Sequence, residues 1–548
     1  MKNINIYAIV LGLLLLYSCS ETNNGTSIVE EDAYTKFTKT EISVSSKGGQ
    51  SSVSLVWENA EWEIETTEEE SFISNISPLS GGEIGKSGYS TISFTLSENN
   101  STAERSQEIF FVNKETGEQE TVVITQGTLP LTEVYPSIKY QKVVGFGGMY
   151  NPAVWISTED RIDSEELATM YDPNGKLQYS VLRLMIYPDK SKWAGDVEGA
   201  LQAQSYGAVI FACPWDCTDE LAEYIDKDGD GGSDKHLPAE NYEAYADHLI
   251  DYVDYMKSKG VNIYAISVQN EPDMDFTYWT PEEVATFTAD YGAKIRETGV
   301  KLMSPEACGF SPEYTNAVLN LSEAFSNTDI VAGHTYQGFT DLTSDYVKNR
   351  HDYICSLYTN YLAAAGKSWW MTEKLFGSSV DDLVNGDYKK WSYSLDKLGL
   401  ELHMCMEGYC SAYVYWYLKR FYGMIGDNNT EYGYIAEGQV MKNGYIMGHY
   451  SSYATGMIRI DIEVPDEDVL ATAYVNETGD VITVVALNMS ENTYETLLEM
   501  PDEVSSHSAI ETTADYDMQD VETSLSDDLK HLKLKISPRS IYSLRIEL

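Results

Sequence analysis

Apolar and polar residues alternate in different ways along three parts of the chain. From residue 39 to 128 the pattern has a period of two, in short runs such as SSVSLVWE (51–58) and STISFTLSEN (90–99). Gly and Asn residues separate these runs, and no helical period appears. Residues 39–128 are therefore predicted to form a β-sandwich with an immunoglobulin-like architecture.

Between residues 133 and 455, continuous apolar runs alternate with amphipathic stretches. SVLRLMIYP (180–188) and NIYAISV (262–268) have the length and composition of strands buried on both faces, as in a parallel sheet. NYEAYADHLIDYVDYMKSKG (241–260) has the period of an amphipathic helix and ends at a glycine. Such alternation over about 300 residues predicts a (β/α)8 TIM barrel.

Residues 456–548 return to short strand patterns, such as DVLATAYVN and VITVVALNMS on either side of a turn. They predict a second, side β-sandwich, formed mainly by the C-terminus and packed on the barrel. The whole chain is thus predicted to be multidomain.

The first residues have the pattern of a targeting segment. Lys2 precedes an apolar run that ends at Tyr17, too short to span a bilayer comfortably. The following Ser18-Cys19 resembles a bacterial lipoprotein signal, which implies that residues 1–19 direct export and that Cys19 is lipidated. An ordinary secretory signal is the alternative. The resemblance predicts an outer-membrane lipoprotein, at the cell surface or facing the periplasm, with a polar linker over residues 20–38.

The β-rich segment 39–128 carries its own resemblance. Trp62 and the closing VVITQG (122–127) make it similar to BACON domains, modules found on secreted enzymes of Bacteroidetes. Glycan binding and a spacer role both remain open for it.

The charge balance limits the choice of partners. The chain has 37 Lys and Arg residues against 86 Asp and Glu residues, a formal net charge of −49. This excess argues against nucleic acid and anionic membrane surfaces as partners. The 41 tyrosines suit sugar rings and an aromatic core equally well. The cysteines beyond Cys19 show no metal-ligand spacing, so neither a metal nor a cofactor is expected.

Two glutamates follow predicted buried strands. Glu271 comes after NIYAISVQN, and Glu373 ends the run SWWMTE (368–373). Chemistry in parallel barrels is carried at the C-terminal strand ends, and glycoside hydrolysis needs two carboxyl groups that face each other. The pair is therefore predicted to be catalytic, on strands four and seven, and the carboxyl that acts as acid must have a raised pKa.

Several further motifs together resemble glycoside hydrolase family 30, and most of all its subfamily 8, the glucuronoxylanases. They are GFGG (145–148), SVLRLMIYP (180–188), FACPW (211–215), MSPE (303–306), GHTY (333–336), WMTE (370–373) and YVYWYLKRFYG (413–423).

The resemblance implies a role for each matching residue. Glu271 would be the general acid/base and Glu373 the nucleophile. The supporting residues would be Asn270 at the sugar 2-hydroxyl, Trp215 packed on a sugar ring, His334 and Tyr336 lining the cleaved-bond subsite, and Arg183 holding the carboxylates from below.

Subfamily 8 enzymes cut the β-1,4-xylan main chain at a position set by a glucuronic acid branch. The branch-binding residues implied here are Trp416, Tyr417, Arg420, Tyr422 and Ser378. A guanidinium fork fits a carboxylate with two parallel hydrogen bonds, although Arg420 could instead pair with an acid of the barrel.

The chain departs from the family pattern directly after Glu373. Lys374-Leu375 stands where the family has an aromatic residue two positions on, and Lys374 is a candidate second cation for the branch.

The expected protein is a monomeric, retaining endo-β-1,4-xylanase acting on xylan with (4-O-methyl)glucuronic acid branches. The alternatives are a less specific xylanase, a β-1,6-glucanase of the same family, and a non-catalytic glycan-binding lipoprotein of the cell surface.

Overall fold

The structure is a computed structural model that describes residues 33–65, 71–101, 103–155, 161–226, 229, 231–274, 276–431 and 435–548. The predicted signal segment with Cys19, and most of the predicted linker, lie outside these residues. The chain divides into two compact units, Met1–Thr128 and Leu129–Leu548. Within the described ranges, no helix combines the length and the apolar character needed to cross a membrane.

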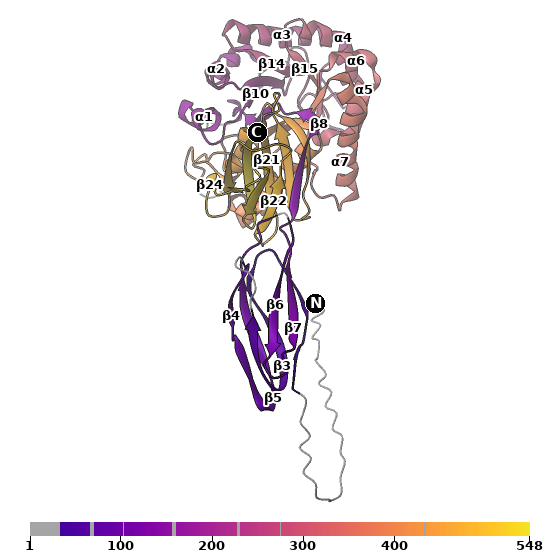
Figure 1. The fold of residues 1–548 in the computed structure, drawn as a ribbon. Helices are drawn as coiled ribbons and strands as arrows, with labels where there is room; N and C mark the ends of the chain where they lie inside the picture. Colours follow the sequence, from indigo (N-terminus) through magenta and orange to yellow (C-terminus); the bar gives the residue numbers. More distant parts are fainter. Residues whose placement is uncertain are drawn as a thin grey trace, which may run out of the picture. The chain divides into compact units, whose positions relative to one another are not determined.

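Among its described residues, the first unit contains strands and no helix (Figure 1). Trp62 is fully buried in its core and lies 6.0 Å from Phe111, measured between ring centroids. The strands form one connected sheet in the order β2-β7-β6-β3-β5-β4, with β1 on β3, so the immunoglobulin-like arrangement stays a prediction. Their bounds are β1 (Tyr34–Phe37), β2 (Glu41–Val44), β3 (Gly49–Glu65), β4 (Ile73–Ser77), β5 (Ser80–Leu96), β6 (Arg105–Asn113) and β7 (Gln119–Gln126).

The second unit contains a closed barrel of eight parallel strands, as the alternating pattern predicts. The barrel strands are buried on both faces, apart from the ends of a few strands. This burial explains the continuous apolar runs. In order around the barrel the strands are β9 (Gly145–Met149), β10 (Val181–Ile186), β11 (Val209–Pro214), β14 (Ile263–Ser267), β15 (Lys301–Ala307), β16 (Ile330–His334), β17 (Ser368–Glu373) and β18 (Cys410–Tyr417).

Helices surround this barrel (Figure 1). Capping boxes begin two of them, at Asp163 before α1 and at Thr280 before α4, where each side chain accepts hydrogen bonds from backbone N–H groups of the first turn. The helices are α1 (Ser164–Tyr171), α2 (Val197–Ser205), α3 (Tyr242–Ser258), α4 (Pro281–Arg296), α5 (Pro312–Asn320), α6 (Ser322–Asn327), α7 (Asp345–Leu357), α8 (Ala363–Ala365), α9 (Val380–Asn385), α10 (Trp391–Ser394), α11 (Leu400–Glu407) and α12 (Lys442–Ala454).

The barrel interior is filled by side chains. Phe211 meets Trp370 edge to face at 5.7 Å, and Tyr264 stacks on Trp370 at 5.9 Å. Because this interior is packed with apolar side chains, polar chemistry is expected at the strand ends. A two-stranded ribbon, β12 (Glu223–Ile225) with β13 (Asp234–His236), is inserted after β11.

A ten-stranded sheet accompanies the barrel, in the order β24-β23-β27-β21-β20-β19-β8-β22-β26-β25. All its strands but one come from the C-terminal part. These are β19 (Ile458–Glu463), β20 (Val469–Val475), β21 (Val481–Asn488), β22 (Tyr494–Glu499), β23 (Ser506–Thr512), β24 (Gln519–Val521), β25 (Ser524–Leu525), β26 (His531–Ile536) and β27 (Ser540–Glu547).

The exception, β8 (Leu131–Lys142), corrects the predicted start of the barrel at residue 133. β8 pairs antiparallel with β19 and parallel with β22, so the barrel begins at β9. The reason is its burial: β8 is exposed or half-buried along most of its length, whereas the barrel needs strands buried on both faces.

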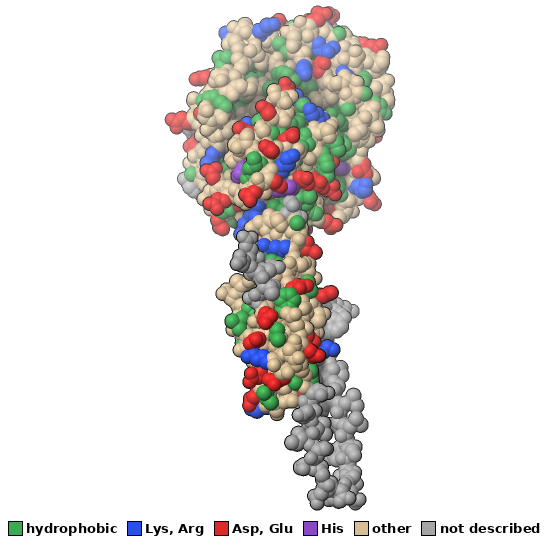
Figure 2. Space-filling model, viewed as in Figure 1, with side chains coloured by type: hydrophobic (Ala, Val, Ile, Leu, Met, Phe, Trp, Pro, Cys, Tyr) green, Lys and Arg blue, Asp and Glu red, His purple; other side chains and the backbone are tan. Residues whose placement is uncertain are grey.

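The acidic excess is spread over the surface. On the face in Figure 2, Asp and Glu side chains are scattered over both units and Lys and Arg side chains lie between them. No single acidic patch on that face accounts for the charge.

The close approach of β9 to β10 yields the first prediction. A Cβ atom at Gly147 would lie 1.7 Å from the carbonyl oxygen of Val181, so the two strands could not keep their spacing. Gly147→Ala should therefore lower the free energy of unfolding by at least about 1–3 kcal/mol, the usual cost of overpacking, measured by urea denaturation. Gly195→Ala is the matched control, because an added Cβ there meets nothing within 4 Å. Equal stability of the two variants would contradict the argument.

Candidate active site

Five ionisable side chains meet at the C-terminal ends of the barrel strands. Glu373, His334 and Glu306 lie in β17, β16 and β15, Arg183 lies in β10, and Glu271 follows β14. Glu271 is 9% exposed, Glu373 is 6% exposed, and the other three are fully buried. The two carboxyl groups predicted to be catalytic thus come from strands four and seven of the barrel.

Arg183 ties these strand ends together. Its Nη1 donates to Glu373 Oε2 at 2.5 Å, and its Nη2 donates to Asn270 Oδ1 at 2.6 Å and to Glu306 Oε1 at 3.0 Å. Burial lowers the pKa of Arg183, but Glu306 and Glu373 outweigh burial and raise it. The guanidinium is therefore charged and holds the carboxylates of Glu373 and Glu306 and the amide of Asn270.

His334 lies beneath Glu271. Its Nδ1 is 2.8 Å from Glu271 Oε1, and its Nε2 is 3.5 Å from Glu306 Oε1. Burial lowers the pKa of His334, but Glu373, Glu271 and Glu306 together outweigh burial and raise it to about 10. The side chain is fully buried. His334 thus contacts Glu271 from within the protein, and its expected place in the lining of the cleaved-bond subsite stays a prediction.

Glu306 was missed by the sequence reasoning as a site residue. Burial raises its pKa, but Arg183 and His334 outweigh burial and lower it to about 2, so Glu306 is a carboxylate. It also accepts a hydrogen bond from the Cys213 thiol at 3.1 Å. The available signal was its place at the end of the apolar run in MSPE, the same setting as Glu271 and Glu373.

The distance between the Glu271 and Glu373 carboxyl groups determines which mechanism of hydrolysis they can support. Ligand atoms of Glu271, His334 and Glu373 all lie within 4.8 Å of one another. Retaining glycosidases place their two carboxyls ~5–5.5 Å apart, and inverting ones ~6.5–9.5 Å apart. Tyr336 donates to Glu373 Oε1 at 2.8 Å, so Glu373 accepts from both Tyr336 and Arg183. The short separation belongs to the retaining geometry.

The same three side chains also have the atom spacing of a metal site. A cation bound there would have to displace the proton of His334 and lie close to the Arg183 guanidinium. This makes the set a poor match for a metal, and the expectation of no metal stays a prediction.

The charges around Glu271 differ from the expectation that the carboxyl acting as acid has a raised pKa. Burial raises the pKa of Glu271, but the hydrogen bond and the charge of His334, together with Cys308 and Arg183, outweigh burial and lower it. Burial raises the pKa of Glu373, and Glu271 adds to this rise against the lowering effects of His334 and Arg183. Of the two carboxyl groups, Glu373 therefore has the raised pKa. His334 holds the proton that was expected on Glu271.

Backbone strain marks the same place. Glu271 has φ of +43° and Glu306 has φ of +63°, in the left-handed region that costs ~1–3 kcal/mol for such residues. A hydrogen bond from the Glu271 N–H to the Glu306 carbonyl oxygen at 3.0 Å holds both turns. Strain of this kind concentrates at functional sites.

An aromatic cluster lies beside Arg183. Trp215 stands over the guanidinium at 4.4 Å and contacts Trp155 and Trp416, with ring centroids at 5.5 and 5.6 Å. Trp215 is only 2% exposed, which corrects its expected role as an open sugar platform. Trp155 and Phe276, each 40% exposed, offer the open ring faces instead. Sequence patterns miss them because both lie in loops.

Four of the residues expected at the branch lie at the end of β18 or shortly after it. Trp416 stacks on Tyr417 at 4.5 Å, and Tyr422 is 7% exposed. The Arg420 side chain is 29% exposed, and its Nη1 lies 3.7 Å from Asp427 Oδ2. This is an ion-pair distance that leaves part of the guanidinium open to the solvent.

The loop after β17 supplies the remaining residues. A Cβ added at Gly377 would meet the Tyr422 Cβ at 3.6 Å, so this loop lies against Tyr422, which follows β18. Ser378 is exposed. Lys374 is buried and donates to the carbonyl oxygen of Thr335 at 2.5 Å. Its ammonium group is therefore held by the protein, and a role for Lys374 as a second cation for a branch stays a prediction.

The chain is similar to characterised enzymes. It is 32% identical to the glucuronoxylanase XynC of Bacillus subtilis (strain 168) over 360 residues, 65% of this chain and 77% of that protein. The chain belongs to glycoside hydrolase family 30. No protein-family model matches it.

Solved structures of family 30 enzymes have the same fold. The GH30 endoxylanase from Clostridium papyrosolvens C71 matches with a TM-score of 0.63 and 27% identity, over 76% of this chain and all of that one. The subfamily 8 xylanase Xyn30A from Clostridium acetobutylicum matches with a TM-score of 0.61 and 23% identity, over 76% of this chain and 99% of that one. The protein is a glycoside hydrolase with the barrel and β-sheet architecture of this family.

The charge on His334 gives a pH prediction. Its pKa of about 10 in the folded protein lies above the ordinary value of 6.5. Stabilisation from the charged imidazole is therefore fully present below about pH 6.5 and is lost as the pH rises through about 10. The free energy of unfolding lost in His334→Asn should be largest near pH 6 and shrink towards pH 10. Urea denaturation of both proteins across this range measures it, and a loss that does not change with pH would refute the assignment.

Proposed function

We propose that this family 30 enzyme is a retaining endo-β-1,4-xylanase that cleaves glucuronoxylan at positions set by a (4-O-methyl)glucuronic acid branch. The single observation that carries the chemistry is the close approach of Glu271 and Glu373, within 4.8 Å. The substrate class comes from the similarity to a glucuronoxylanase and to a GH30 endoxylanase.

In the first step Glu373 is the nucleophile. An oxygen of its carboxylate forms a bond to the anomeric carbon, the glycosidic C–O bond breaks, and Glu271 gives a proton to the leaving oxygen. In the second step a water attacks the same carbon, Glu271 takes a proton from it, and Glu373 leaves. Two inversions retain the anomeric configuration. Arg183 and Tyr336 both donate to Glu373, and these two hydrogen bonds favour its anionic form against the effect of burial.

The proton for the leaving group starts close by. His334 holds one at Nδ1, 2.8 Å from Glu271 Oε1. Glu373 is the largest of the charges that keep this proton on the imidazole. As Glu373 loses its charge in the covalent bond, that hold weakens, and the proton moves to Glu271. This removes the conflict between the lowered pKa of Glu271 and its role as acid.

The catalytic roles are tested by amide substitution. Glu271→Gln and Glu373→Gln should each lower kcat on glucuronoxylan by at least about 10²–10⁴-fold, because each removes a proton-transfer or nucleophilic group. Reducing-end release measures the rate. Glu297→Gln, at an exposed position at the end of α4, is the control.

The anomer of the first product tests the geometry independently. Proton NMR during hydrolysis should show the β-anomer first, since retention follows from the short carboxyl separation. An α-anomer formed first, or unchanged turnover in either amide variant, would overturn the assignment.

Arg420 is the residue proposed to select the branch. Its guanidinium is partly exposed and is flanked by Tyr422 and by the Trp416–Tyr417 stack. Within a chain of net charge −49, a local cation is what an acidic sugar needs. Leu375, in place of the family's aromatic residue, removes one wall of the branch pocket and weakens the dependence on the branch.

Substitution at Arg420 should separate binding of the branch from chemistry. Loss of a charge-assisted contact worth about 1.5–3 kcal/mol should lower kcat/KM of Arg420→Leu on glucuronoxylan by about 10- to 150-fold. Arabinoxylan without glucuronic acid is the control substrate and should show no further loss. Arg420→Lys should recover only part of the activity, because an ammonium lacks the planar fork.

Side-by-side digestion also decides among the alternatives. Products that each carry one glucuronic acid support the proposal, and equal cleavage of arabinoxylan would indicate a general xylanase. Activity on neither polymer directs the search to β-1,6-glucan. Binding of glucuronoxylan without hydrolysis would indicate a glycan-binding lipoprotein.

The proposal for its location rests on sequence alone. Lipidation of Cys19 would anchor the enzyme in the outer membrane, at the surface or in the periplasm.

A further inference from the structure

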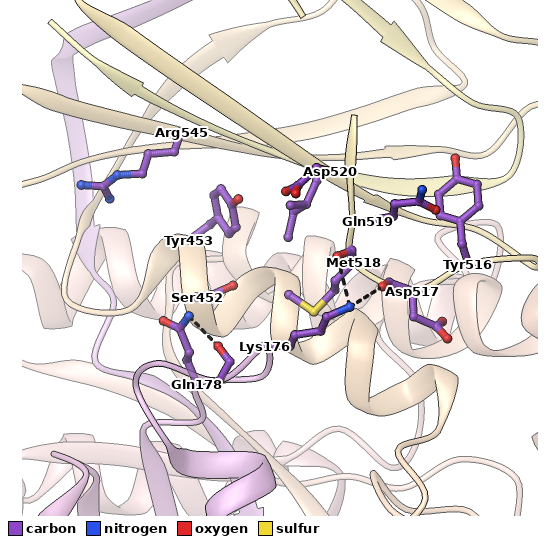
Figure 3. A pocket seen from close by; sticks show the side chains of 12 residues that line it. Lys176, Gln178, Ser452, Tyr453, Tyr516, Asp517, Met518, Gln519, Asp520 and Arg545 are labelled. Carbon is purple, nitrogen blue, oxygen red and sulfur yellow. Dashed lines mark hydrogen bonds between the residues drawn. The ribbon is translucent and has the colours of Figure 1, made fainter. Parts of the chain in front are cut away.

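A second cavity of about 750 Å³ lies within the catalytic unit, outside the active site (Figure 3). One wall is the loop Gly175–Gln178, which comes just before β10, and the end of α12 at Ser452 and Tyr453. This wall belongs to the N-terminal ends of the barrel strands, the opposite end from Glu271 and Glu373. The cavity therefore takes no part in the bond cleavage.

The other wall comes from the side sheet. It consists of Ile510 in β23, Arg545 in β27, and the segment that leads into β24. The cavity thus exists only because the barrel and the side sheet meet here. Its volume falls in the ~300–1,000 Å³ range of small-ligand sites.

Tyr453 is the central residue of this cavity. Its ring is half-buried and lies between Arg545 and Asp520 in Figure 3. Burial raises the pKa of the Tyr453 hydroxyl to about 12, with Asp520 raising it further and Arg545 lowering it, which agrees with that placement. Within the described residues, this hydroxyl makes no hydrogen bond to the protein.

Other polar groups here also lack protein partners. Among the described residues, the Gln519 amide and the Asp520 carboxylate make no side-chain hydrogen bond, and both residues are exposed. Arg545 has only a 3.6 Å ion pair with Glu547, and its side chain is 47% exposed. Donors and acceptors therefore stand together around one aromatic ring, and apart from the Arg545–Glu547 pair the described residues give them no side-chain partner.

The remaining lining residues complete the chemistry of the cavity. Lys176 donates to the Asp517 carbonyl oxygen at 3.0 Å, and Asp517 pairs with Lys442 at 2.7 Å, so these charges are used within the protein. Arg545 and Asp520 then balance each other. Ile510 and Met518 add apolar surface beside the Tyr453 ring. The cavity is neutral overall, with an apolar surface and a mixed polar rim.

Sugar rings match this combination. A pyranose has an apolar face that packs on a tyrosine, and its hydroxyls both donate and accept hydrogen bonds. An anionic ligand would find Asp520 opposing it, and a purely apolar one would leave the polar rim unpaired.

We propose that the cavity around Tyr453 is a second carbohydrate-binding site, which holds a short neutral stretch of the xylan chain that the cleft cleaves. The choice of xylan rests on the proposed function. Because the site lies at the far end of the barrel, it holds the enzyme on the polymer while the cleft acts.

Binding stoichiometry tests this proposal. The full-length Glu373→Gln variant, in which hydrolysis is suppressed, is titrated calorimetrically with xylohexaose carrying one glucuronic acid branch. It should bind two molecules, one in the cleft and one at Tyr453. Glu373→Gln/Tyr453→Ala should bind one. Glu373→Gln/Tyr361→Ala should still bind two, since Tyr361 is a 53% exposed tyrosine outside both sites.

A second variant tests the same site in case Tyr453→Ala does not fold. Asp520 is exposed, so Glu373→Gln/Asp520→Ala should keep its unfolding midpoint while the weaker of the two affinities falls by about tenfold. Asp254→Ala, at an exposed site on α3, is its control.

The possible failures can be told apart. One bound molecule in the parent variant, unaffected by Tyr453→Ala and Asp520→Ala, overturns the second site and leaves the proposed function standing. No binding in the parent variant, with no hydrolysis of glucuronoxylan by the unsubstituted enzyme, refutes the proposed substrate and with it the xylan ligand.

Discussion

The buried guanidinium of Arg183 is the interaction on which the rest of the site depends. It joins Glu373, Glu306 and Asn270, which belong to different strands of the barrel. Each partner compensates a charge or dipole that burial would otherwise penalise, and loss of one partner from such a cluster costs ~3–5 kcal/mol. The strand ends are therefore held in one arrangement before any substrate arrives, which places the two exposed carboxyls at a fixed, short separation.

The same cluster controls where protons reside. Arg183 and charged His334 face three carboxyl groups, and burial, with the charge of Glu271 added to it, raises the pKa of Glu373. These groups titrate together. In the proposed mechanism, the proton that Glu271 gives to the leaving group is therefore shared by the whole cluster beforehand. In the proposed mechanism, the buried His334 supplies Glu271 with an internal proton as the charge on Glu373 changes.

The fold places the candidate active site and the proposed second carbohydrate-binding site at opposite ends of the barrel. The barrel keeps its reactive groups at the C-terminal strand ends, whereas the side sheet meets the barrel at the other end and forms the cavity around Tyr453. β8 contributes to this division, because it precedes the barrel in the chain and yet lies between β19 and β22. The side sheet is thereby connected to the barrel at both ends of the barrel sequence.

Much of this could be predicted from the sequence. Continuous apolar runs determined the barrel, because only strands buried on both faces need them, and glutamates at the ends of two runs indicated the catalytic pair. Burial and contact were decided by the tertiary structure. Trp215 and His334 stand in motifs that resemble those of the family, yet packing buries both side chains. Lys374 is buried as well. Glu306, Trp155 and the residues around Tyr453 become a site only where distant segments meet. Periodicity reports which side of an element is apolar, whereas the distance between two elements depends on how the whole chain packs.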